Sequence, residues 1–136
     1  MKPFSSRVKK VNFDATILAD DISNHDIDSR SMSADFKKYL PLTESTAYTL
    51  LALTEPLHGY GVMQKVESMS DGTVKIGPGT LYGAFITLES EGLIVKVNEA
   101  ERRKIYALTD KGRQVLKEHI RRLEIMVNNG QSTKDW

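Results

Sequence analysis

The most constraining feature of this 136-residue chain is a pair of apolar runs, at residues 57–68 and 75–93, with six residues between them. Each run carries apolar residues at helical spacing, and the second run stops at Gly92. Two amphipathic helices joined by a short turn are typical of a helix-turn-helix. In the second run Leu81, Phe85 and Leu88 recur at i, i+4 and i+7. This spacing predicts that they face a core.

The other side of the second helix, predicted over residues 78–91, carries almost no charge. Its members are small, polar or aromatic: Pro78, Gly79, Thr80, Tyr82, Gly83 and Thr87. Polar tips and glycines suit the floor of a DNA major groove better than bulk water. Thr80 and Tyr82 are the expected base-edge or phosphate contacts, and the two glycines are expected to permit close approach. Pro78 fits the first helical turn, where its missing N–H has no partner in any case.

Glycines also open both helices, as GYG at residues 59–61 and GPG at residues 77–79. Neither triplet matches a phosphate-binding or dinucleotide-binding loop, so nucleotide binding is not expected. The backbone N–H groups at both helix starts can instead meet DNA phosphates. For Tyr60, core packing with a wet hydroxyl and contact with a phosphate stay equally open. His58 is interpreted as a capping or packing residue rather than a metal ligand.

A further helix is predicted before the pair, capped by Thr43 and stopped by Pro56. After Gly92 the pattern alternates, which predicts two short strands joined by a hairpin tip at residues 98–103. Three helices followed by a hairpin are the order of a mainly α winged helix-turn-helix (α+β), assigned here to residues 33–108. At the hairpin tip lie three cations: Arg102, Arg103 and Lys104. A charge run is usually solvated surface, but on a wing it is expected to bind phosphates, which Glu99 and Glu101 would weaken.

The last predicted element is an amphipathic helix at residues 109–130, followed by a tail at residues 131–136. Its apolar stripe includes Leu116, His119, Ile120, Leu123, Met126 and Val127. The small core is already closed by the preceding elements, so the natural partner of this stripe is a second copy of the chain. The helix is therefore predicted to form a homodimer interface.

Composition narrows the remaining functions. No segment is apolar enough to span a membrane and no secretory signal is visible, so we expect a cytoplasmic protein. There are no cysteines, and the three histidines share no ligand spacing, so neither a metal nor a cofactor is expected. No catalytic constellation emerges, and an enzyme is not expected. The net charge of +1 requires any DNA contact to rest on local cations. Residues 1–32, rich in serine and aspartate, are predicted to be a poorly ordered arm.

Three blocks of this sequence resemble the PadR-like family of transcriptional regulators: LLALTEPLHGYGVMQ at residues 50–64, GPGTLYGAFITLESEGLI at residues 77–94, and YALTDKGRQVL at residues 106–116. The resemblance covers about residues 40–130. It implies a dimeric winged-helix repressor that responds to a small aromatic or cationic ligand. The single C-terminal helix is similar to the short class of the family. The segment before Met32 has no counterpart in the pattern, so we expect Met32 to be the natural start.

These observations predict a homodimeric regulator that binds double-stranded DNA at an inverted repeat. An effector would bind between the subunits, near Tyr48 of one copy and His119, Leu123 and Met126 of the other, because the core of one winged helix is filled by its own residues. The alternative is a winged helix that serves as a protein-interaction adaptor, which the near-neutral charge would also allow.

Overall fold

The computed structural model describes residues 36–100 and 102–136, and the predicted arm at residues 1–32 lies outside them. The described residues form two compact units. One is residues 42–116, and the other comprises residues 36–41 and 117–136. No helix in these described stretches is long and apolar enough to cross a membrane.

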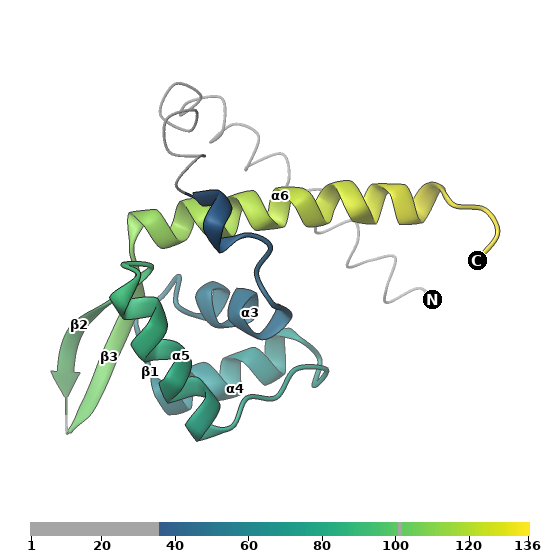
Figure 1. The fold of residues 1–136 in the computed structure, drawn as a ribbon. Coiled ribbons are helices and arrows are strands. Elements are labelled where there is room, and N and C mark those ends of the chain that lie inside the picture. The colour runs from purple at the N-terminus through teal and green to yellow at the C-terminus, as the bar shows by residue number, and fades with distance from the viewer. Residues whose placement is uncertain (1–35, 101) are drawn as a thin grey trace. The chain divides into compact units, whose positions relative to one another are not determined.

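The helices of the first unit are α3 (Glu44–Ala52), α4 (Gly59–Met69) and α5 (Pro78–Ser90) (Figure 1). Thr43 caps α3 as predicted, since its hydroxyl oxygen accepts the Thr46 N–H at 3.2 Å. The helix ends at Ala52, before Pro56, so it is shorter than the sequence indicated. The predicted start of α4 is confirmed, and α5 is confirmed to begin at Pro78.

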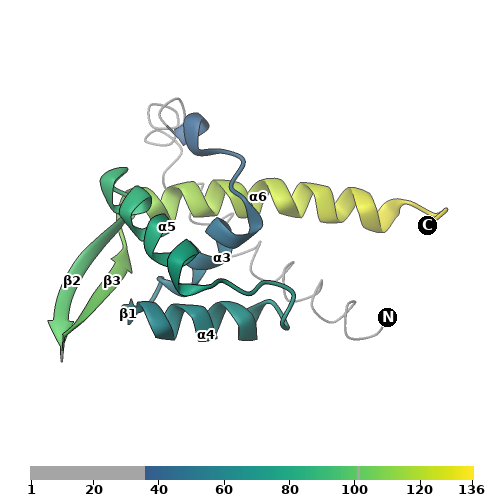
Figure 2. The same ribbon diagram turned by 60° about the horizontal axis from the view of Figure 1, so that its bottom comes forward.

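The sheet has three strands, whereas the sequence predicted two. The strands are β1 (Leu57–His58), β2 (Ile94–Ala100) and β3 (Arg103–Leu108), in the antiparallel order β1-β3-β2. Leu57 lies opposite Tyr106, so the segment just before α4 is hydrogen-bonded to the middle of the sheet. The register of β2 shifts between Lys96 and Asn98. Figures 1 and 2 show the β2–β3 hairpin extending away from the helices, as the wing of a winged helix does.

The core gathers apolar side chains from every helix of the first unit and from the sheet. The predicted inward side of α5 is confirmed, because Leu81, Phe85 and Leu88 are buried. Fully buried partners come from the other elements: Leu50, Leu53, Val62, Val66, Leu93, Ile94 and Val115. Packing of this apolar surface fixes which side of α5 remains in solvent.

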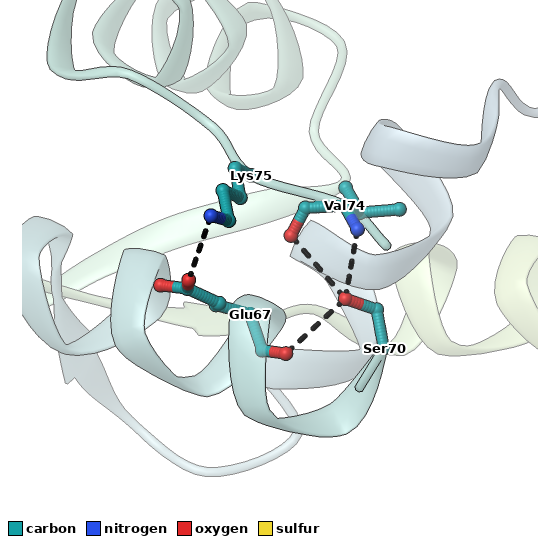
Figure 3. A network of polar contacts seen from close by, with 4 residues as sticks. All are labelled: Glu67, Ser70, Val74 and Lys75. Atoms are coloured by element: carbon teal, nitrogen blue, oxygen red, sulfur yellow. Dashed lines mark hydrogen bonds and ion pairs between the residues drawn. The ribbon is translucent and has the colours of Figure 1, made fainter. Parts of the chain in front are cut away.

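The turn between α4 and α5 is closed by the buried hydroxyl of Ser70 (Figure 3). Its oxygen accepts the Val74 N–H at 3.0 Å and lies 3.2 Å from the Val74 carbonyl oxygen and 3.3 Å from that of Glu67, to which it can donate. An ion pair of 3.6 Å joins Lys75 and Glu67 across the same turn. Gly72 supplies the left-handed backbone, with φ of 77°. These contacts hold the turn that leads from α4 towards α5.

The C-terminal helix α6 (Asp110–Ser132) begins as predicted after Thr109, whose hydroxyl oxygen accepts the Gly112 N–H at 3.0 Å. It continues two residues beyond the predicted end at residue 130. Within the first unit, Gly112 packs directly against the carbonyl oxygen of Leu93, where no side chain would fit. Before α3 lies a short 3₁₀ helix, η1 (Lys37–Tyr39).

Candidate nucleic-acid interface

The outward side of α5 carries the residues that the sequence singled out, and all of them are exposed: Pro78, Gly79, Thr80, Tyr82, Gly83 and Thr87. A Cβ built on Gly79 or on Gly83 would meet nothing within 4 Å. The two glycines therefore serve no packing need in the protomer. They leave the helix backbone open to close approach from outside.

Beside this surface lies a groove of about 450 Å³ between α5, the start of α4 and the wing. Its lining joins predicted and unpredicted residues: His58, Gly59, Tyr60, Tyr82, Phe85, Ile86, Arg102, Arg103, Lys104 and Tyr106. The fold thus brings Tyr60, Tyr82 and the wing cations together at one groove. Tyr60 is exposed, which removes the core-packing alternative left open by the sequence.

Tyr82 is held in place by its neighbours. Its ring stands edge-on to Phe85, with the centroids 6.4 Å apart, and Phe85 in turn packs on Tyr106 at 4.7 Å. The ring also contacts Gly59, where a Cβ would come within 3.3 Å. Burial, followed by the charge of Glu89, raises the pKa of the Tyr106 hydroxyl. An aromatic row therefore supports Tyr82 from the core to the groove.

His58 connects the start of α4 with the wing. Its Nδ1 accepts the Gly61 N–H at 3.1 Å, which confirms the predicted capping role. Its Nε2 lies 3.4 Å from Nη1 of Arg103. In a neutral ring that accepts at Nδ1, the proton sits on Nε2, so two donors face each other at the second contact. The guanidinium of Arg103 is therefore not satisfied by this ring and can bind an anion.

The wing cations are all exposed. Arg102 adopts a left-handed backbone with φ of 67° at the turn, and Lys104 lies opposite Glu99 in the sheet register. Glu101 lies outside the described residues. Among the described residues, no group of three or more His, Asp or Glu side chains is arranged to hold a metal ion.

The apolar stripe of α6 divides into a buried and an exposed part. Leu116 and His119 are buried in the protomer, which narrows the surface predicted for dimer contact. Further along the helix, Ile120 and Val127 are half-buried, whereas Leu123 is 41% exposed and Met126 is 69% exposed. Tyr48, predicted near an effector, is half-buried.

Among the residues that line the groove, His58 and Ile86 are not buried in the core, and the sequence did not assign either of them to the interface. His58 was placed as a cap without a link to the wing, because the contact with Arg103 spans 45 positions in the chain. Ile86 follows Tyr82 by one helical turn, and that spacing alone would have placed it on the outward side.

Comparisons with known proteins agree with this architecture. The model of the transcriptional regulator PadR-like family matches residues 48–118. The chain is similar to a transcriptional regulator from Clostridium thermocellum, with 25% identity and a TM-score of 0.53 over 74% of this chain and 99% of that one. A PadR family regulator from Eggerthella lenta gives 27% identity and a TM-score of 0.52 over 83% and 99% of the two chains.

An uncharacterized 37.1 kDa protein in transposon TN4556 of Streptomyces fradiae is 40% identical over 68 residues, which are 49% of this chain and 19% of that protein. The chain therefore matches only about a fifth of the length of this relative. The family model covers more than half of the chain, and the fold is similar to that of the two solved regulators. The chain belongs to the PadR-like family of transcriptional regulators.

Proposed function

We propose that this chain is a sequence-specific DNA-binding repressor that acts as a homodimer on an inverted repeat. One observation carries the proposal: the outward side of α5, which carries no charge from Pro78 to Leu88, opens onto a groove whose far wall is the cationic wing. A polar helix surface suits base edges, and the flanking cations suit the phosphates on either side of them.

In this proposal α5 lies in the major groove with Thr80, Tyr82 and Thr87 toward the bases. Gly79 and Gly83 let the helix backbone approach closely, because no side chain stands between it and the DNA. Gly77, the N-cap of α5, provides no side-chain hydrogen bond to the first turn. The N–H groups of that turn can therefore bind a phosphate, as helix starts commonly do. Arg102, Arg103 and Lys104 bind the backbone beside them.

Dimerisation is proposed through the exposed part of α6, around Leu123 and Met126. A large apolar side chain left in solvent gains about 1.5 to 3 kcal/mol when it is buried, so two symmetric copies of this surface would stabilise each other. A two-fold dimer would present two recognition helices to half-sites about 34 Å apart, or a multiple of that distance.

An effector is proposed to bind between the subunits, near Tyr48 of one copy and the Leu123 and Met126 region of the other. A small aromatic or cationic ligand there would release DNA by favouring one spacing of the recognition helices over another. Titration of aromatic acids and planar cations against the DNA complex tests this. The release should change in Leu123→Ala and Met126→Ala, and equal release from both variants and the wild type would place the site elsewhere.

The deciding experiment for DNA binding is selection of bound duplexes from a random pool by the full chain. We expect an enriched inverted repeat, which would establish sequence specificity and symmetry together. A pool that shows no enrichment would favour the adaptor alternative, for which the net charge of +1 is the supporting observation.

A further inference from the structure

The apolar side chain of Ile86, on the outward side of α5, lies in solvent and does not contribute to the core. It is 71% exposed, although its immediate neighbour Phe85 is buried in the core. Isoleucine is also a slightly poorer helix former than alanine, because its branched Cβ loses rotamer freedom in a helix. Neither packing nor helix propensity in the protomer accounts for isoleucine at this position.

The surroundings of Ile86 show which surface it would meet. It lies one helical turn after Tyr82 and lines the same groove, whose opposite wall is formed by the wing cations. Gly83, which precedes it by three residues on the same side of α5, leaves open space. Among the described residues that line the groove, Ile86 is the only aliphatic one, and its neighbours are aromatic rings and the wing cations. That setting suits a polyanion with a single apolar feature better than an extended apolar protein surface.

DNA has one such feature in the major groove, the C5-methyl group of thymine. We propose that Ile86 contacts the methyl group of one thymine in each half-site and thereby selects that base. The inference rests on the proposed DNA binding through α5. It adds recognition of an apolar group to the polar contacts proposed for Thr80, Tyr82 and Thr87. Cytosine lacks this methyl group, whereas 5-methylcytosine carries it at the corresponding position. Ile86 should therefore recognise the methyl group, whether thymine or 5-methylcytosine carries it.

The test uses the full chain and the duplex recovered from the random pool. Each thymine is replaced in turn by uracil, which removes only the C5-methyl group. One symmetric pair of positions should respond, with binding weakened about fourfold for each methyl lost, the effect of removing one buried methyl group. A cytosine at that position should bind more weakly than thymine, and 5-methylcytosine should recover about the same factor.

Two variants assign the effect to the side chain. Ile86→Ala should bind thymine and uracil duplexes equally. Val97→Ala, which truncates another exposed apolar residue, 51% exposed on the wing strand β2, should keep the full uracil penalty. Both variants should unfold at the wild-type temperature, because both side chains lie largely in solvent.

The outcomes separate this inference from the function on which it rests. A chain that selects no duplex overturns both. A selected duplex that tolerates uracil at every position, or a uracil penalty that persists in Ile86→Ala, overturns the role of Ile86 and leaves DNA binding intact. A large loss of thermal stability in Ile86→Ala would likewise overturn it, since the side chain would then serve the fold.

Discussion

Gly59 lies against the ring of Tyr82, so that the first residue of α4 and the outward side of α5 meet at one point. A Cβ on Gly59 would come within 3.3 Å of both the ring and the hydroxyl oxygen of Tyr82. That distance is shorter than an ordinary van der Waals contact. The position of the Tyr82 hydroxyl in the groove therefore depends on the absence of a Cβ at residue 59.

Gly59→Ala should move the Tyr82 ring by a few tenths of an ångström and weaken binding to the selected duplex by about 1 kcal/mol, the scale of one perturbed hydrogen bond. Titration of both proteins with the labelled duplex measures this. In a Tyr82→Ala background the same substitution should have no further effect. An equal loss in both backgrounds would show that Gly59 acts on DNA without Tyr82.

Replacing the wing cations should change the salt dependence of DNA binding. Arg102→Asn removes the charge while asparagine tolerates the left-handed backbone at that position, and Arg103→Gln removes the second charge. Each lost phosphate contact should reduce the slope of log affinity against log salt by about 0.9. Arg113→Gln, at an exposed position on α6, is the control and should keep the slope. If the double variant of Arg102 and Arg103 keeps the wild-type slope, these two arginines do not contact the DNA backbone.

Two glycines of α6 should respond to alanine in opposite directions. At Gly112 a methyl group would overlap the Leu93 carbonyl oxygen and lie 2.8 Å from Leu108 Cδ1. The free energy of unfolding should therefore fall by about 1 to 3 kcal/mol or more. At Gly130 the nearest atom, in the Trp136 ring, would be 3.7 Å away, so alanine should stabilise the helix by about 0.5 to 1 kcal/mol. Urea unfolding of both variants checks this, and equal effects would contradict the packing at Gly112.

Stability should fall as the pH is lowered through about 6.5. Burial, and then the charge of Arg122, lower the pKa of His119 below its usual 6.5. The unfolded chain then binds a proton at a higher pH than the folded chain does, so this contribution is complete above 6.5 and is lost below it. Glu118 acts in a lower window, because its hydrogen bonds from Arg121 lower its pKa below 4.5. Urea unfolding between pH 5 and 8 should show the first loss in the wild type but not in His119→Met.

A charge on the exposed part of α6 should separate the proposed dimer. Leu123→Glu should give a monomer at micromolar concentration, because each buried leucine contributes about 1.5 to 3 kcal/mol. Asn128→Glu adds the same charge at another exposed position of the helix and should stay dimeric. Light scattering measures both masses. A wild type that is already monomeric would refute this interface.

The elements of this fold that follow a periodic pattern could be predicted from the sequence. The spacing of Leu81, Phe85 and Leu88 was enough to orient α5, because burial on a helix repeats every three or four residues. Strand β1 could not be found this way, because two residues, Leu57 and His58, are too few to show an alternation of apolar and polar side chains. Their pairing with β3 is what makes them a strand. The contact of Gly59 with Tyr82 depends on packing between two helices, which no local pattern contains.

The pairing of β1 with β3 affects how the molecule can approach a duplex. β1 ends at His58, where α4 begins, and β3 starts at Arg103 in the wing, so consecutive hydrogen bonds link the wing to the base of the helix pair. Movement of Ile105 and Tyr106 relative to α4 must break that pairing. The base of the wing and the helices therefore approach a duplex as one preorganised body, and the orientational entropy of docking is lost once for both parts.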